Sequence, residues 1–491
     1  MRKRFERQLK LGQTPIEEVQ IPLKMRDELP PILAGLQWIY ATPEINEQVF
    51  QLLEKKMVVG KKKTGRPGMD LWHVLVLGLV RLALDCNYDR LEYLAHYDKL
   101  MRQIMGLDSS FSGEFDKGFH QKTISENVCH VDDELLGKIN EIVAKAGRKI
   151  LKKNENEKIA AKTDTYVLES NVHFPTDLNL LWDAARKCIR LLSRLSEEKG
   201  LSGWRKNHDW EHQIKGLMRM CGRLNHAGGQ NKEARLEAIV RKYLNKSYQL
   251  ETKVFESIKH LQSIRLSPPQ FGQLLTVQYF HDMLIKHIDL VDRRLLKNEA
   301  IPHEEKLFSL FEPFTEWITK GKLKPSVELG LKLLVTTDQY GIVLDYKVMQ
   351  QSSDSSENIA LIERLLKRFG DDAFSSISFD KGFSRESDKE LIALYIPNVI
   401  MPKKGRLNAE EKALESTRKF KTLRHKHSAI ESNINGLEHH GLNRCPDKGL
   451  RGFKRYAGFG VLAYNLHKIG NHLLAERWKQ SFKEHHRAKA A

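Results

Sequence analysis

The chain has 491 residues, too many for one ordinary hydrophobic core, so we expect two to four domains. It carries 81 Lys and Arg against 63 Asp and Glu, and this net charge of +18 favours a polyanionic partner, most simply nucleic acid. Five widely spaced cysteines without a CxxC pair argue against zinc fingers and disulfide frameworks and fit a reducing cytoplasm. The charged N-terminus lacks the apolar stretch of a signal peptide, and the most apolar run, residues 71–84, is shorter than the roughly 20 residues that span a bilayer.

Residues 1–155 are expected to form an α-helical N-terminal region that binds DNA. Residues 70–84 are typical of a buried core helix, and shorter helices are expected at 88–96 and 99–106. The sequence Thr-Ile-Ser-Glu at 123–126 has the form of a capping box before another helix. Helical clusters next to basic loops often bind DNA as helix-turn-helix variants, and helical packing without a DNA role is the alternative.

A cationic Gly/Pro stretch at residues 61–69 precedes the expected core helix. Its positive side chains can contact phosphates if the stretch lies as a loop along DNA, and a solvated loop is the alternative. The candidate DNA-binding residues here are Lys61, Lys62, Lys63 and Arg66.

A strand is expected at residues 159–168, and after Pro175 apolar residues recur at helical spacing to about residue 320. This long helical block has no catalytic signature of its own. From residue 324 the pattern becomes alternating, as in strands. The expected elements are strands at 327–336 and 342–349, a helix at 355–370, a strand at 375–380, a helix capped by Ser384 that runs to about 394, a strand at 398–401, and helices at 427–441 and 452–482.

Without the helical block, this order of elements matches an RNase H-like α/β fold. We therefore expect an α/β RNase H-like catalytic domain with a large α-helical insertion, behind the helical N-terminal region. The expected boundaries are 156–181 for the first part of the catalytic domain, 182–323 for the insertion, 324–470 for the remainder, and 471–491 for a basic C-terminal helix or tail.

Three acidic residues stand in the surroundings expected of metal-binding carboxylates. Asp164 lies in the first strand, Asp380 ends a later strand, and Glu431 lies on a helix near the C-terminus. Adjacent strands lie about 4.8 Å apart, so two strand-borne aspartates can share a metal to which a neighbouring helix adds a third carboxylate. Mg²⁺ prefers such oxygen ligands. The three residues are therefore candidates for a two-metal site of phosphoryl transfer.

Four ordered segments resemble those of DDE transposases of bacterial insertion sequences, most of all the loosely classified ISNCY-type elements. The resemblance covers about residues 70–470 and is weakest over the helical block. The segments are Asp164 to Asp177, Phe311 to Gly330, Phe-Asp-Lys-Gly-Phe at 379–383, and the glutamate motif with its tail from Ile430 to Leu466.

The resemblance implies an enzyme that cleaves and joins DNA at the ends of an insertion sequence. Asp164, Asp380 and Glu431 would be its catalytic and metal-binding residues, with two Mg²⁺ or Mn²⁺ ions as cofactors. Its partners would be duplex DNA, as terminal repeats and target, and further copies of the chain in a homodimer or higher oligomer. The resemblance also implies a cytoplasmic, nucleoid-associated location in a bacterium.

The chain departs from its apparent relatives beside the glutamate. Many relatives carry basic residues four positions before and seven after it, where this chain has His427 and Glu438. His427 can still contact phosphate, and the candidates for the missing positive charge are Arg424, Lys426 and Arg444.

Some alternatives remain open at the level of the sequence. Glu438 is a rival third carboxylate, and Asp177 is a rival first aspartate at an expected strand-to-helix junction, where a helix cap is the simpler reading. His208 and His212 have the i, i+4 spacing of a helical metal pair without an evident third ligand. The alternative functions are a catalytically silent, transposase-derived DNA-binding protein and an RNase H-like nuclease without strand transfer.

Overall fold

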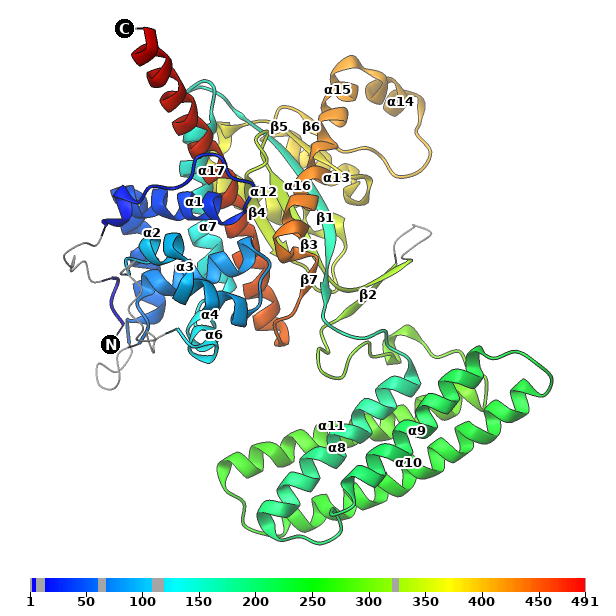
Figure 1. Cartoon of the computed structure of the whole chain (residues 1–491). Coiled ribbons are helices and arrows are strands. Elements are labelled where there is room, and N and C mark those ends of the chain that lie inside the picture. The colour runs from blue at the N-terminus through cyan, green and yellow to red at the C-terminus, as the bar shows by residue number, and fades with distance from the viewer. Residues whose placement is uncertain (1, 6–13, 61–67, 108–118, 320–325, 491) are drawn as a thin grey trace. The chain divides into compact units, whose positions relative to one another are not determined.

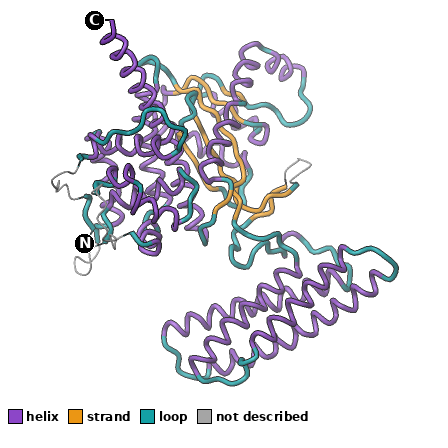
Figure 2. Tube along the Cα trace, in the orientation of Figure 1, coloured by secondary structure: helices purple, strands orange, loops and turns teal. Residues whose placement is uncertain are grey.

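A mixed seven-stranded sheet contains Asp164 in one of its strands, and Asp380 directly follows another (Figure 1; Figure 2). Its central strand β1 (Ile159–Ser170) pairs antiparallel with β3 (Val327–Thr337) and parallel with β5 (Phe374–Phe379). On the outer sides, β4 (Val343–Val348) pairs antiparallel with β3, and β6 (Val399–Ile400) pairs parallel with β5. Two short strands complete the sheet, β2 (Glu316–Thr319) beside β3 and β7 (Arg444–Cys445) beside the end of β1.

The computed structural model describes residues 2–5, 14–60, 68–107, 119–319 and 326–490. The chain divides into two units, of which the first contains the sheet and the second contains helices. The first unit is Met1–Asn171 with Ile318–Ala491, and the second is Val172–Trp317.

The strand predictions are confirmed, because each of the five expected strands agrees with the structure to within two residues. Their β-branched and aromatic residues fit a pleated surface that is buried on at least one face. The mixed α/β class of the chain is therefore present in the structure. Of the two short strands, neither β2 nor β7 stands out in the sequence pattern, because each is only a few residues long.

Helices of the first unit come from both ends of the chain. The N-terminal ones are α1 (Leu29–Ala41), α2 (Pro43–Met57), α3 (Leu71–Ala83), α4 (Tyr88–Tyr97), α5 (Lys99–Ile104), α6 (Gln121–Val128) and α7 (Asp133–Leu151). Those after β4 are α12 (Asn358–Phe369), α13 (Glu386–Ala393), α14 (Ala409–Ser416), α15 (Arg418–His427), α16 (Ala429–Leu437) and α17 (Gly449–Ala490).

Two of the expected helix caps are wrong. The capping box predicted at 123–126 lies inside α6, whose first backbone donors are met by the side chain of His120. Ser384 does not cap α13, because the chain first makes a tight turn at Lys381–Phe383 and the helix starts at Glu386. Thr123 lies three residues after the actual N-cap His120, and Ser384 lies one residue before the actual N-cap Arg385, so tertiary packing decides where each helix starts.

The long helix α17 is the common support of the first unit. Its N-terminal half is buried and packs against α1, α3, α7 and β4, which joins the N-terminal helices to the sheet (Figure 1). Gly35 of α1 and Gly470 of α17 allow these two helices to approach closely. A Cβ atom on Gly35 would lie 2.5 Å from the carbonyl oxygen of Leu466, and one on Gly470 would lie 1.8 Å from that of Pro31.

The second unit is a bundle of four helices. They are α8 (Asp177–Lys199), α9 (Asn207–His226), α10 (Lys232–Gln262) and α11 (Pro268–Leu295). Its own apolar core includes Cys188, Tyr243 and Val277, each fully buried. The helical pattern expected to about residue 320 ends at Leu295, and the chain beyond it is mostly irregular up to β2. None of the described helices is both long and apolar enough to cross a membrane.

A buried amide on α17 fixes the helical layer to the sheet. The side-chain oxygen of Asn465 accepts the backbone N–H of Val343 at 2.8 Å, and its amide donates to the Val343 carbonyl at 2.9 Å and to Asn140 at 2.8 Å. Asn140 of α7 donates to the same carbonyl at 3.1 Å. Because both side chains are buried, loss of either one would leave polar groups without partners.

We therefore expect Asn465→Ala to lower the free energy of unfolding by about 3 kcal/mol in urea titrations, since several buried groups lose their hydrogen bonds. Gln480→Ala, an amide truncation at an exposed position of the same helix, should change it by less than about 0.5 kcal/mol. Equal effects of the two variants would contradict a structural role for Asn465.

Candidate active site

Asp164 and Asp380 lie on neighbouring strands at matching positions. In the parallel pairing of β1 with β5, Thr163 stands opposite Phe379, and the next residue on each strand is an aspartate. Parallel neighbours are about 4.8 Å apart, so the two carboxylates share one region of the sheet. Asp164 is half-buried, and Asp380 is exposed where β5 ends.

Glu431 lies on the short helix α16, and hydrogen bonds on the two sides of β1 hold α16 and the helix before it, α15, to the sheet. His427, just before α16, shares a hydrogen bond of 3.0 Å between its Nδ1 and the hydroxyl of Ser378 on β5. Within α16, Asn433 donates to the hydroxyl of Thr337 on β3 at 3.1 Å. Because β3 and β5 are the two neighbours of β1, these bonds hold Glu431 beside the strand that carries Asp164.

The helix predicted over residues 427–441 corresponds to α16, which starts at Ala429, and to the helical turn that follows it, whereas α14 and α15 were not predicted. The chain breaks at Ser428 between α15 and α16, and α16 ends at Leu437 before a kinked turn, η6 (Glu438–Leu442). The residues just before Ser428 are mostly basic, and the hydrogen bond of His427 to the sheet belongs to α15 whereas that of Asn433 belongs to α16. The break lets the two short helices meet the sheet at two different strands.

Electrostatics confirms that the acidic groups are close to one another. Burial, together with the negative charges of Asp380, Asp354 and Glu431, raises the pKa of Asp164 to about 7. The backbone N–H of Thr165, 2.7 Å from the carboxylate of Asp164, acts in the opposite direction. Desolvation and like charges both disfavour the ionised form of a carboxyl group. A cation bound at this position would favour the ionised form of Asp164 and so lower its pKa.

Asp354 is a member of this cluster that sequence reasoning missed. It follows β4 in the turn η3 (Asp354–Glu357) and accepts hydrogen bonds from Thr165 Oγ1 at 3.2 Å and from Lys332 Nζ at 3.0 Å. A Cβ atom on Gly382 would lie 2.8 Å from its other oxygen, which places Asp354 beside the turn after Asp380. Its position depends on how a loop folds back over the sheet, and no spacing in the sequence signals that.

The three candidate residues offer the donor set that a hard divalent cation prefers. Carboxylate oxygens from two strands and one helix suit Mg²⁺ or Mn²⁺, and burial, followed by the neighbouring negative charges, raises the pKa of Asp164 in the absence of a cation. Their ligand oxygens do not belong to the described groups in which all donor atoms lie within 4.8 Å of one another. Asp164, Asp380 and Glu431 would hold the ions, and Asp354, already paired with Lys332, would adjust the local charge.

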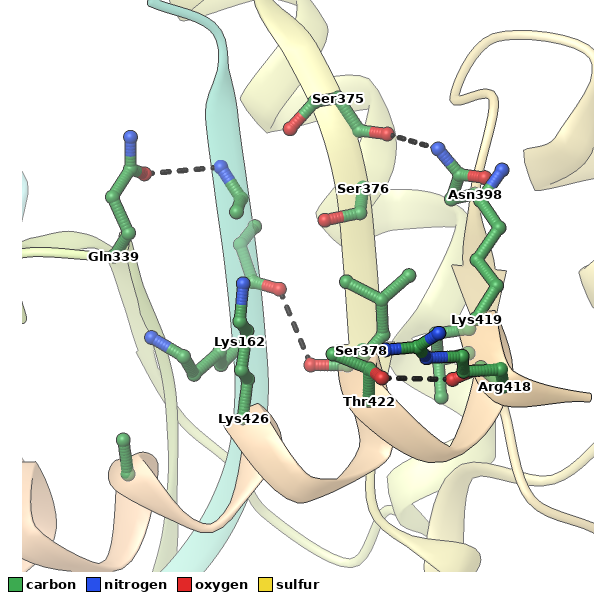
Figure 3. A pocket seen from close by; sticks show the side chains of 15 residues that line it. Lys162, Gln339, Ser375, Ser376, Ser378, Asn398, Arg418, Lys419, Thr422 and Lys426 are labelled. Carbon is green, nitrogen blue, oxygen red and sulfur yellow. Dashed lines mark hydrogen bonds between the residues drawn. The ribbon is translucent and has the colours of Figure 1, made fainter.

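A basic cavity of about 870 Å³ opens on the same face of the sheet (Figure 3). Side chains alternate along a strand, so Lys162 and Ser378 face the same side as the aspartates two residues after them. The remaining walls come from β6 and α15, and the described lining contains no carboxylate. Its cations are Lys162, Arg418, Lys419 and Lys426, and its hydroxyl groups are those of Ser375, Ser376, Ser378 and Thr422.

The charge states of the cavity residues are set by burial. Burial lowers the pKa of Lys162, Asp338 raises it, and the nearby positive charge of Lys426 lowers it further. Lys162 donates a hydrogen bond of 3.2 Å to the carbonyl oxygen of Asp338. Burial also lowers the pKa of His427, so at neutral pH this side chain is a hydrogen-bonding group and not a cation. The positive charge expected near the glutamate must therefore come from lysine and arginine.

Other predicted DNA-binding residues lie in different surroundings. Lys426 lines the cavity, while Arg424 is exposed and 3.5 Å from Glu415. Arg444 is exposed on β7, where it forms an ion pair of 3.0 Å with Glu169. The remaining four predicted residues, Lys61, Lys62, Lys63 and Arg66, lie outside the described residues.

The rival carboxylates and histidines occupy other places. Asp177 belongs to the second unit and pairs with Arg294 at 2.6 Å, while Thr176 caps the helix that follows. Glu438 is half-buried and its charge raises the pKa of the buried Tyr166. His208 and His212 are exposed on α9, as expected for a solvated helix face.

The chain matches no family model, no curated protein and no solved structure. What the site can do must therefore be argued from its own geometry and charges.

We expect Asp164→Asn to raise the unfolding temperature of the metal-free protein at pH 8 by roughly 3 °C. The pKa of Asp164 in the folded protein, about 7, exceeds that of an unfolded aspartate, so its ionisation costs folding free energy as the pH rises through this range. The gain should therefore shrink as the pH falls toward that of the unfolded carboxyl group.

The measurement is thermal unfolding in the presence of a chelator at several pH values. Glu363→Gln, at an exposed position of α12, is the matched control and should have little effect at any pH. A lower unfolding temperature for Asp164→Asn at pH 8 would contradict the crowding of negative charge described above.

Proposed function

We propose that the chain is a DDE transposase that cleaves and joins DNA by metal-dependent phosphoryl transfer. The observation that carries this proposal is the position of Asp164 and Asp380 one residue beyond a paired position of adjacent strands. Glu431 is held nearby, because its helix α16 is bonded to β3 through Asn433 and the preceding helix α15 is bonded to β5 through His427. A two-metal site needs carboxylates from separate elements that converge in this way.

The arrangement of the sheet supports an RNase H-like catalytic domain within the first unit. Along the sheet, β4, β3 and β1 are antiparallel neighbours, and β5 and β6 extend it in parallel from β1. The helix α12 joins β4 to β5, and α13 joins β5 to β6. The helical bundle of the second unit interrupts the chain between β1 and β3, in keeping with an insertion in such a domain.

The reaction divides between the cations and the side chains of the chain. When bound, the divalent cations activate the attacking oxygen and stabilise the leaving oxygen. Asp164 must give up its proton to act as a ligand, which neighbouring positive charge favours. In the first step water attacks the phosphodiester, an O–P bond forms, and the bond to the 3′-oxygen breaks. The freed 3′-OH then attacks a phosphodiester of target DNA, releasing a new 3′-OH.

The basic cavity supports DNA as the substrate. Four cations and four hydroxyl groups without a lining carboxylate suit a phosphodiester backbone next to the scissile bond. The cavity lies two residues upstream of each aspartate on the same face of the sheet, so a strand in it would lead toward the acidic cluster. Phosphate contacts of this kind position DNA without reading its sequence.

Asp380→Asn should reduce Mg²⁺-dependent cleavage of DNA carrying the element ends by more than about a hundredfold, because a metal ligand loses its charge. Binding to the same DNA should survive, since the side chain keeps nearly the same volume. Cleavage is measured on gels and binding by mobility shift, using the DNA that flanks the coding region. Asp371→Asn, at an exposed position just before β5, is the control. Cleavage by Asp380→Asn at the parental rate would refute the proposed metal site.

The same assay separates transposition from simple nuclease activity. With a substrate that already ends in a 3′-OH, a transposase joins that end to a target plasmid, whereas a nuclease only cuts. Joined product in Mg²⁺ is the outcome that the proposal requires, and cleavage without any joined product would favour the nuclease.

Changing Lys419 and Lys426 together to alanine should reduce the slope of log affinity against log salt by about 2, since each lost phosphate contact on duplex DNA removes about 0.9. The double control, Lys149→Ala with Lys367→Ala, removes two exposed lysines from α7 and α12 and should leave the slope nearly unchanged. Parallel lines for parent and cavity variant in a salt titration would show that DNA does not enter the cavity.

A further inference from the structure

Two histidines and a glutamate form a second cluster of potential metal ligands in the first unit. One donor atom from each of Glu28, His440 and His467 lies within 4.8 Å of the others. Glu28 immediately precedes α1, His440 lies in the turn after α16, and His467 lies on α17. Three segments distant in the sequence therefore meet at one point. We propose that this cluster is a binding site for a transition metal, best suited to Zn²⁺ and separate from the acidic cluster.

The backbone around His440 is shaped to present its ring to α17. Gly441 has a φ of 81°, which favours glycine, and a Cβ atom there would lie 2.7 Å from Asp85 Oδ1 and 2.8 Å from Tyr456 Oη. Glycine is therefore required at position 441 for two reasons: the backbone has a positive φ, and there is no room for a Cβ atom. It brings the ring centroids of His440 and His467 to 4.6 Å from each other.

The hydrogen bonds of His440 leave one ring nitrogen available for a metal. Its Nδ1 lies 2.8 Å from the carbonyl oxygen of Ala83, which can only accept, so Nδ1 carries the proton. Nε2 then holds a lone pair. Ligand histidines in metal sites are commonly oriented in this way, by donating the other ring N–H to a backbone carbonyl.

His467 needs one small rearrangement to become a ligand. Its Nε2 faces Glu28 Oε2 at 2.5 Å, and its Nδ1 lies 3.2 Å from the side-chain amide of exposed Asn471. Turning that amide over lets its oxygen accept a proton from Nδ1, and Nε2 is then free to bind a metal. Amide orientations of this kind follow from the hydrogen-bond network and reverse easily at an exposed site.

The chemistry of the donors separates this cluster from the acidic one. Two imidazole nitrogens with one carboxylate suit Zn²⁺, whereas Mg²⁺ prefers oxygen donors alone. The exposed His439, 3.4 Å from Glu28, is near enough to Glu28 to supply a fourth ligand in place of water.

The experiment is a titration of full-length protein with Zn²⁺ by calorimetry, after treatment with a chelator. It is made in the Asp380→Asn background so that zinc bound by the acidic cluster contributes less. One equivalent should bind, and at a free zinc concentration a hundred times Kd the unfolding temperature should rise by roughly 3 °C. His467→Gln should abolish both effects, and Glu28→Gln should weaken binding by at least about tenfold.

His485→Gln is the matched control, since it removes an exposed histidine from the same helix and should leave zinc binding unchanged. If His467→Gln does not fold, Glu28→Gln decides the question, because Glu28 is half-exposed and its loss leaves the helix packing intact. Zinc binding that is unaffected in Glu28→Gln or His467→Gln would overturn the proposal. Absence of binding at micromolar zinc would show that the cluster is only a hydrogen-bonded histidine–carboxylate group.

Discussion

The burial of Asp164 beside other carboxylates is the constraint on which the candidate site depends. Four acidic groups gather where β1 and β5 run side by side, and in the absence of a cation one of them, Asp164, is driven toward its protonated form. Lys332 offsets part of this charge. Hydrogen bonds from His427 of α15 to β5 and from Asn433 of α16 to β3 hold the segment of Glu431 beside the sheet. Such a cluster is poorly suited to stability and well suited to holding cations.

The helix α17 is the second element on which the first unit depends, because it packs against both the N-terminal helices and the sheet. Buried polar contacts supplement its apolar packing. Asn465 ties it to β4 and α7, and Asp447, just before it, receives Arg81 from α3 and Arg455 from α17 itself at 2.7 and 2.9 Å. Removing either arginine would leave this buried carboxylate with less compensating charge, which strongly destabilises a folded protein. The position of the N-terminal helices thus depends on residues near the C-terminus.

The sequence predicted the features that depend on neighbouring residues, such as strands. It did not predict contacts between segments that are distant in the chain. Alternating apolar residues gave the five principal strands, and the order of strands and helices placed Asp164 and Asp380 at comparable points of the sheet. The helices α14 and α15 were missed because residues 409–427 are mostly polar and show no continuous apolar face. Asp354 and the cluster around His440 were missed for another reason: their neighbours come from distant segments, so no spacing in the chain signals them.

The second unit interrupts what is otherwise a simple antiparallel pair. Leu168 and Glu169 of β1 stand opposite Leu331 and Gly330 of β3, so two strands that pair directly are separated in the sequence by the whole second unit. Closing so long a loop costs chain entropy, and contacts between residues far apart in sequence slow folding. Helices with nearby partners in the chain form early, and a bundle that folds first holds its own ends together. The folded bundle would then act as a short connection between β1 and β3, and the loss of chain entropy on pairing these two strands would be smaller.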